Sequence, residues 1–175
     1  LNYRVQLASL TTMEEGDLSK YVNAGKVVCL NADKSTQPGS IVSGLGLLKS
    51  DTDEQIIIVI PFTEKVKIRS VAVTAESKGD VDGAPKVVKL FKNQENLDFN
   101  DAEDAEPTAE LELSKDDVKS GKVKKLKFTK FQSVETMTVF IESNQGDEEQ
   151  TFLNNITFYG MPIQGTNMSE LKKSG

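Results

Sequence analysis

The sequence of 175 residues contains no histidine and no tryptophan, and its single cysteine is Cys29. Without histidine, neither a serine–histidine–acid triad nor a histidine general base can be built. One cysteine cannot supply a dithiol redox motif, an internal disulfide or a four-ligand structural zinc site. These counts exclude many hydrolytic, redox and zinc-dependent chemistries for this chain, and the scarcity of cysteine fits a reducing compartment.

Long apolar runs are also missing. No stretch approaches the roughly 20 apolar residues of a membrane-spanning helix, and the N-terminus, LNYRVQLASL, lacks the features of a signal peptide. Because the chain does not begin with Met, we expect that it was processed or cut from a longer protein. The net charge of −6 disfavours nucleic acid and anionic membrane as partners, because both are negatively charged.

One segment is unusually apolar for its length. Five β-branched residues in succession, Ile56 to Ile60, form most of a predicted strand at 55–62. A continuous apolar run of this length indicates burial on both faces of a sheet. Pro61 has no N–H for a ladder hydrogen bond, so we expect it to mark the end of the strand or an edge position.

The next predicted strand, 65–74, changes the phase of its apolar residues halfway along. Val66 and Ile68 share one face, whereas Val71 and Val73 share the other. Such a change requires one extra residue, so the sequence predicts a β-bulge near Arg69-Ser70.

The rest of the chain reads as short strands with fragments of helix. Further strands are expected at 86–92, 110–113, 122–131, 136–142 and 151–159. A short helix is predicted at 17–24, with Asp17 as N-cap, and one helical turn runs from a Ser114–Asp117 capping box to Gly121. Loops are expected at 31–40 and 76–85, a polar excursion with little core at 93–109, and a polar tail at 161–175. This pattern predicts one all-β domain, a two-sheet antiparallel sandwich with short helical turns.

Two acidic stretches are candidate metal sites. Asp51, Asp53 and Glu54 resemble the start of a calcium loop, but Gln55 and Ile56 stand where an acidic residue and a glycine should follow. The pattern therefore favours a solvated turn that protects the apolar strand behind it. The run DAEDAE at 101–106 is interpreted in the same way, and we expect neither a metal nor a cofactor.

Lysine is concentrated in one segment. Six of the twelve residues at 119–130 are lysines: Lys119, Lys122, Lys124, Lys125, Lys127 and Lys130. In a strand their alternation would line one face, which suits a solvated, protected sheet edge. A protein-binding face and a nucleic-acid site are the alternatives, the last disfavoured by the acidic whole. Cys29 lies among Val27, Val28 and Leu30, which favours a small core residue over a reactive thiol.

Three longer blocks occur in an informative order: SDTDEQIIIVIPF (50–62), KFTKFQSVETMTVFIESNQGDEE (127–149), and GMPIQGTNM (160–168) followed by Lys172 and Lys173. Together they resemble the PITH domain family, which includes the C-terminal domain of thioredoxin-like protein 1. VCLNADKS (28–35) and APKVVKLFKN (84–93) resemble the same family more loosely. The resemblance covers nearly the whole chain.

This resemblance implies a jelly-roll β-sandwich of the galactose-binding-like type, similar to the DOC domain. The domain would occupy 15–165, between an N-terminal extension (1–14) and a C-terminal tail (166–175). It also implies a monomeric, non-enzymatic module that docks on the regulatory particle of the 26S proteasome, in cytoplasm and nucleus. Any redox activity would belong to an N-terminal thioredoxin domain elsewhere in the parent protein.

Candidate partner-binding residues come from two charged groups. They are Asp147, Glu148 and Glu149 before the last strand, and Lys124, Lys125 and Lys127 in the lysine segment. The alternative function is a small-ligand sandwich that binds carbohydrate or calcium. Sugar sites exploit exposed aromatic faces, and only 6% of this chain is aromatic, mostly at strand positions.

Overall fold

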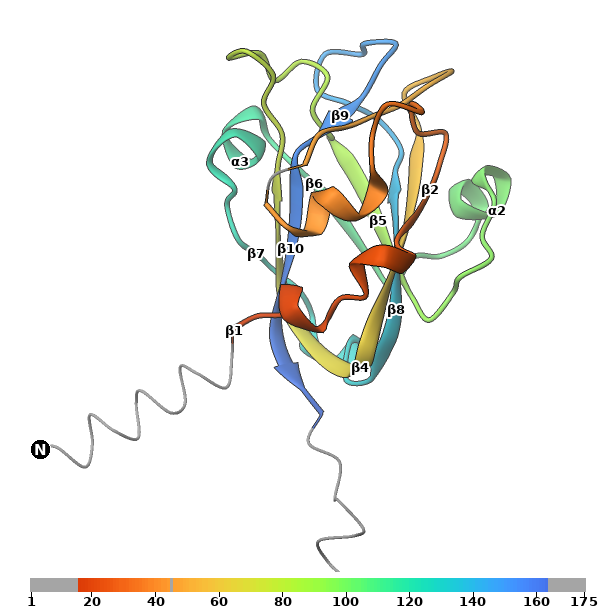
Figure 1. Ribbon diagram of the computed structural model, residues 1–175, viewed down its shortest axis with the longest axis vertical. Helices are drawn as coiled ribbons and strands as arrows, with labels where there is room; N and C mark the ends of the chain where they lie inside the picture. The colour runs from red at the N-terminus through yellow and green to blue at the C-terminus, as the bar shows by residue number, and fades with distance from the viewer. Residues whose placement is uncertain (1–15, 45, 164–175) are drawn as a thin grey trace, which may run out of the picture.

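One long strand organises the computed structural model, which describes residues 16–44 and 46–163 (Figure 1). Strand β4 (Ile56–Thr74) is 19 residues long. Its first half pairs with β2 (Val28–Leu30) and β8 (Val134–Ile141). Its second half pairs with β10 (Asn155–Pro162) and β7 (Lys124–Lys125). In Figure 1, β4 bends at the lower end of the molecule and so passes from one layer to the other.

The two layers are antiparallel sheets. The first has the order β2-β4-β8-β5-β6, where β5 is Val87–Lys92 and β6 is Ala109–Glu112. The second has the order β1-β10-β4-β7, where β1 is Gly16–Asp17. A small separate pair joins β3 (Leu48–Lys49) to β9 (Phe152–Leu153). The predicted two-sheet antiparallel sandwich is confirmed.

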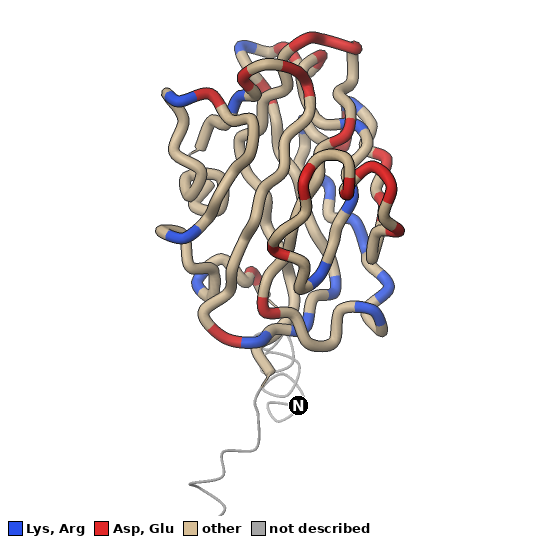
Figure 2. The backbone as a smooth tube through the Cα atoms, turned by 90° about the vertical axis from the view of Figure 1, so that its right-hand side faces the viewer, with Lys and Arg blue, Asp and Glu red and all other residues tan. Residues whose placement is uncertain are grey.

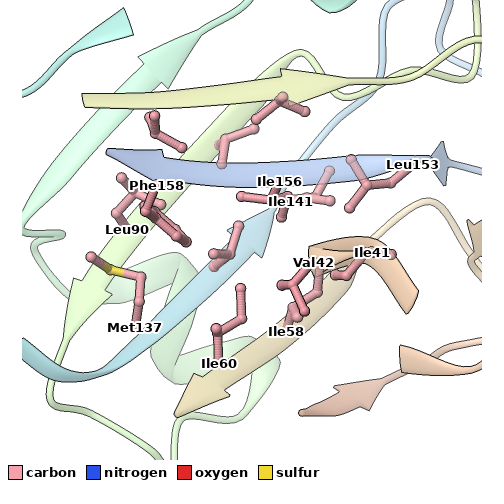
Figure 3. Close-up of a cluster of buried hydrophobic side chains, with 14 of the residues drawn as sticks. Ile41, Val42, Ile58, Ile60, Leu90, Met137, Ile141, Leu153, Ile156 and Phe158 are labelled. Carbon is pink, nitrogen blue, oxygen red and sulfur yellow. The ribbon is translucent and has the colours of Figure 1, made fainter. Parts of the chain in front are cut away.

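The core lies between the sheets and extends onto an outer face. Ile56, Ile58 and Ile60 of β4 point into the main core, part of which Figure 3 shows with Met137, Ile156 and Phe158. Full burial of an isoleucine side chain contributes roughly 1.5–3 kcal/mol. Ile57 points the other way, into a second cluster with Phe91 and Phe140. The prediction that this run is buried on both faces is therefore confirmed.

A short helix within the expected polar excursion covers the second cluster. Helix α2 (Phe99–Asp104) begins after Asp98, whose Oδ1 accepts a hydrogen bond from the N–H of Asp101 (2.7 Å). Its Ala102 is fully buried, and Phe99 packs edge-on against Phe140 with ring centroids 6.2 Å apart. The expectation that 93–109 offers little core is wrong, because the acidic composition hides a few apolar residues that face the sheet.

Pro61 does not end the strand. It lies within β4, opposite Thr136 of β8. The β4–β8 pairing breaks after Pro61 and resumes only at Val66 and Val134. The Pro61 carbonyl accepts a hydrogen bond from the Asn23 N–H (2.8 Å), so the backbone of Pro61 faces away from β8, on the side of β4 where the pairing with β2 has ended at Val59. A strand end is therefore wrong for Pro61, whereas the alternative of an edge position fits this side of β4. The chain continues as a strand because its next partners are in the other sheet.

The predicted bulge is confirmed at the expected place. Tyr159 of β10 lies opposite Ser70, whereas the next residue, Gly160, lies opposite Ile68. Arg69 is therefore the extra residue, which lets both Ile68 and Val71 face the core.

The helical turns confirm one prediction and correct another. Helix α3 (Lys115–Ser120) has the full Ser114–Asp117 capping box and ends at Gly121 in the left-handed conformation (φ 68°). The helix expected at 17–24 is wrong: the chain makes two 3₁₀ turns, η1 (Ser19–Tyr21) and η2 (Ala24–Lys26). Two further 3₁₀ helices are η3 (Pro38–Val42) and η4 (Phe128–Lys130). Across 16–44 and 46–163, no helix has both the length and the apolar character of a membrane span.

Most of the predicted flanking segments lie outside the described residues. This applies to the N-terminal extension (1–14) and the C-terminal tail (166–175). The tail expected from 161 begins later than that, because Met161 and Pro162 still belong to β10.

Candidate functional site

The acidic triplet Asp147, Glu148 and Glu149 lies in the loop between β8 and β9, and a buried amide organises this loop. Asn144 is 1% exposed. Its Nδ2 donates to the Glu148 carbonyl (2.8 Å) and to Thr151 Oγ1 (3.1 Å), and its Oδ1 accepts from the Glu148 N–H (2.8 Å). The side chain of Asn144 thus substitutes for backbone partners and fixes the loop that carries the triplet.

Two neighbouring loops are tied to the same place. From the loop before β4, the Glu54 carbonyl accepts a hydrogen bond from Thr151 Oγ1 (2.6 Å). From the loop after β4, the Asp82 carbonyl accepts one from the Gly146 N–H (2.8 Å). A Cβ on Gly146 would lie 2.9 Å from the Asp82 Cβ, so this close approach of the loops needs glycine.

Carboxylates from all three loops therefore gather at one end of the sandwich, which we call the acidic end. Glu54, Asp80, Asp147, Glu148 and Glu149 border two shallow depressions there, together with Asn144 and Phe152. Asp82 belongs to the same end through the bond between its carbonyl and the Gly146 N–H. Figure 2 shows acidic residues gathered on the loops at the end of the molecule opposite the one where the described chain begins. Asp82 is paired with Lys115 (2.9 Å), and its hydrogen bond raises the pKa of Lys115.

The acidic end does not assemble a metal centre. Within 16–44 and 46–163, no three cysteine, aspartate or glutamate side chains are placed to hold an ion together. The side chain of Asp53, one of the residues that resembled a calcium ligand, accepts hydrogen bonds from within the protein instead. Its Oδ1 accepts hydrogen bonds from Asn31 Nδ2 (2.8 Å) and from the Gln55 N–H (3.0 Å). These bonds shape the turn before the apolar strand.

The lysine segment does not form the strand expected at 122–131. Only Lys124 and Lys125 pair, as β7, with the edge of β4, and the 3₁₀ turn η4 follows. The alternation therefore stops at Lys127, and Phe128 is 48% exposed instead of sharing the core with Leu126.

The three candidate lysines have different environments. Lys124 Nζ lies 2.8 Å from Asp117 Oδ2, and both side chains are largely covered. This bond, with a second from the Ser114 N–H, lowers the pKa of Asp117 to about 2. Lys125 and Lys127 are exposed. The structure therefore places Lys124 in an internal ion pair and leaves the other two on the surface, on a different element from the acidic triplet.

Val123 and Arg69 also lie at this edge, and neither was predicted as a surface residue of a binding site. Val123 is 47% exposed, and the guanidinium of Arg69 lies over the Phe128 ring, 5.1 Å from its centroid. Arg69 is the bulge residue of β4, and its carbonyl accepts a hydrogen bond from the Leu126 N–H (2.8 Å). The bulge thus brings Arg69 and the segment after β7 together.

Cys29 lies on β2 and packs partly against the core. Burial raises the pKa of its thiol to about 12. At neutral pH the thiol stays protonated, and the thiolate is the reactive form. Cys29 is therefore a partly buried residue packed against the core, and its burial disfavours the thiolate form.

Solved structures share this architecture. A family 32 carbohydrate-binding module from Clostridium perfringens NanJ, in complex with galactose, superposes with a TM-score of 0.60 over 83% of this chain and 98% of that chain, at 10% identity. The CBM32-1 and CBM32-2 domains of Clostridium perfringens ZmpB, in complex with GalNAc, give a TM-score of 0.64 over 87% of this chain and 38% of that chain, at 11% identity. At such identities the likeness concerns the fold alone, and it defines the class: a galactose-binding-like jelly-roll β-sandwich.

Sequence comparison then identifies the family. The PITH domain matches residues 8–175, so this chain belongs to the PITH domain family. Thioredoxin-like protein 1 of Schizosaccharomyces pombe is 42% identical over 130 residues, which are 72% of this chain and 44% of that protein. A PITH domain-containing protein of Drosophila melanogaster is 28% identical over 142 residues, 77% of this chain and 64% of that protein. The chain thus spans less than two thirds of either relative.

Proposed function

We propose that this domain is a non-enzymatic protein-interaction module that docks a thioredoxin-like parent protein on the regulatory particle of the 26S proteasome. Membership of the PITH domain family carries the proposal, together with the 42% identity to a thioredoxin-like protein of which this chain matches less than half. In the parent protein, an N-terminal thioredoxin domain would supply the redox chemistry. The module would act as a monomer in the cytoplasm and nucleus.

The chemistry of the chain supports a binding role. It has no histidine for proton transfer, and burial keeps the only thiol protonated. Its distinctive surfaces are charged: the acidic end and the lysine segment beside β7. Complementary charge raises the rate and the specificity of protein association. Both surfaces are held by internal hydrogen bonds, so little order has to be gained when a partner binds.

A capture experiment tests this function. The domain, immobilised on beads, is expected to retain regulatory-particle subunits from a cell lysate, identified by mass spectrometry. Recovery of no proteasome subunit above the level of bare beads would contradict the proposal. In parallel, an insulin-reduction assay on the domain alone is expected to stay at background, because a dithiol needs two cysteines.

Carbohydrate binding is the second candidate, because related folds were solved with galactose and GalNAc. The aromatic side chain bordering the acidic end, Phe152, is only 9% exposed. That leaves little aromatic face for a sugar ring to stack on. A glycan array and a calcium-dependent shift in melting temperature separate the two functions, and we expect neither to respond.

A further inference from the structure

The edge of the second sheet combines positive charge with exposed apolar side chains. Residues 119–130 contain six lysines and no carboxylate, in a chain whose net charge is −6. The charge of Lys124 is neutralised by Asp117 of α3. The other lysines around β7 have exposed side chains. We call this surface the basic edge, and it comprises Lys122, Val123, Lys125, Lys127, Phe128 and Lys130.

Hydrogen bonds hold the turn that carries Phe128. Its carbonyl accepts hydrogen bonds from the Phe131 N–H (3.0 Å) and from Gln132 Nε2 (2.9 Å). Phe131 is fully buried, and its own carbonyl accepts from the Ile68 N–H of β4 (3.0 Å). The buried Phe131 therefore anchors the turn, while Phe128 stays 48% exposed beside Arg69. An aromatic side chain held in place at the surface has little entropy left to lose on binding.

Protection of a sheet edge does not account for this combination. Lysines alone keep an edge soluble and unpaired. An exposed aromatic residue at the same edge works against that protection, because exposed apolar groups promote association. Among the described residues, five large apolar side chains are notably exposed, and two of them, Val123 and Phe128, lie here. Phe128 is the one aromatic residue in that group.

We propose that the basic edge binds an extended acidic segment of a partner protein, with an apolar side chain of that segment against Phe128. The proposal deepens the docking function and rests on it, since the partner would be a proteasome subunit. Carboxylates of the segment would pair with Lys125, Lys127 and Lys130. Charge complementarity selects a polyanion, and the apolar contact together with the overall negative charge favours a peptide over nucleic acid.

Two variants test the apolar and charged contributions separately. Phe128→Ser removes the aromatic anchor, and Lys125→Glu with Lys127→Glu reverses two charges. Each is expected to raise the dissociation constant for purified 26S proteasome about tenfold, because central aromatic and charged contacts dominate binding energy. The matched controls are Leu30→Ser, at a comparably exposed apolar residue of β2, and Lys34→Glu, at an exposed lysine elsewhere. Both controls should bind like the wild type, and all variants should keep the wild-type melting temperature.

A minimal probe separates failure of the surface from failure of the function. The probe is a short fluorescent peptide rich in Asp and Glu with one central Leu, and its binding should weaken with added salt. Replacing that Leu by Ser should weaken binding to the wild type but not to Phe128→Ser.

If proteasome binding survives both test variants, the basic edge is refuted and the docking function stands. If the peptide binds through this edge but the proteasome does not, the docking function fails and the preference for acidic segments is supported. Tighter, edge-dependent binding of a uridine oligonucleotide would overturn the proposal.

Discussion

At the scale of single residues, two buried polar side chains hold the charged surfaces in place. Asn144 fixes the acidic triplet through three hydrogen bonds. Asp117 links α3 to β7 by accepting bonds from Lys124 and from the Ser114 N–H. A local motif alone predicts neither role. The partners of Asn144 depend on the path of the loop, and Lys124, the partner of Asp117, lies beyond the helix that Asp117 caps.

Replacing Asn144 by Ala is expected to destabilise the domain by about 2–3 kcal/mol, because buried partners lose their hydrogen bonds. Urea unfolding at neutral pH measures the change. Glu149→Gln, at an exposed position of the same loop, should stay within about 0.5 kcal/mol of the wild type. A wild-type unfolding midpoint for Asn144→Ala would show that the amide does not hold the loop.

The pKa of Asp117 gives a dependence of stability on pH. Folding lowers it from 3.8 to about 2, chiefly through the hydrogen bond from Lys124. A carboxyl group with a lowered folded-state pKa contributes stability above its unfolded pKa, and that contribution is lost as the pH falls through the folded value. The contribution of Asp117 should therefore be complete above about pH 4 and disappear toward about pH 2.

Asp117→Asn tests this dependence. At pH 7 we expect a loss of about 1–3 kcal/mol, because Lys124 loses its charged partner. The difference between wild type and variant should shrink as the pH is lowered from about 4 to about 2. Asp116→Asn, at the exposed neighbour, controls for loss of a surface charge. A difference that stays constant over this range would contradict the assignment.

At the scale of elements, β4 shows what could and could not be predicted from the sequence. The bulge at Arg69 was predictable because the apolar residues change phase, and α3 because its capping box and terminal glycine are local signals. The continuation through Pro61 was not, because it depends on a change of partner strands at the bend. Helix α2 could not be predicted for a related reason. Its buried Ala102 packs against residues of the sheet that are distant in the sequence.

The bulge yields a matched pair of glycine substitutions. Gly16 and Gly160 lie opposite each other on β1 and β10. A Cβ on Gly160 would overlap the Lys67 carbonyl oxygen of β4, whereas a Cβ on Gly16 would meet nothing within 4 Å. Gly160→Ala should therefore cost about 2–3 kcal/mol of unfolding free energy through overpacking, and Gly16→Ala about 0.5 kcal/mol or less. Equal melting temperatures for the two variants would refute the close approach of β10 to β4.

The candidate site was predictable only in part. The acidic triplet and the lysine cluster stood out by composition, and the structure keeps Lys125 and Lys127 on the surface. The sequence could not show that Lys124 is held by Asp117. Nor could it show that Phe128 leaves the core, because that follows from η4 replacing the expected strand.

At the scale of the whole molecule, the described chain begins and ends at the same end of the sandwich. Gly16 pairs with Gly160, and the Ile163 N–H donates to the Lys65 carbonyl near the bend of β4. The loops of the acidic end lie at the opposite end (Figures 1 and 2). The first described residue, Gly16, is therefore remote from the loops of the acidic end.

Sedimentation with purified proteasome particles tests the central claim most directly. The domain is mixed with intact 26S particles or with isolated 20S core particles, and the fraction that sediments with each is measured as the domain concentration rises. Docking on the regulatory particle predicts saturable co-sedimentation with 26S particles and background levels with the 20S core. Equal sedimentation with both particles, or none with either, would contradict the account.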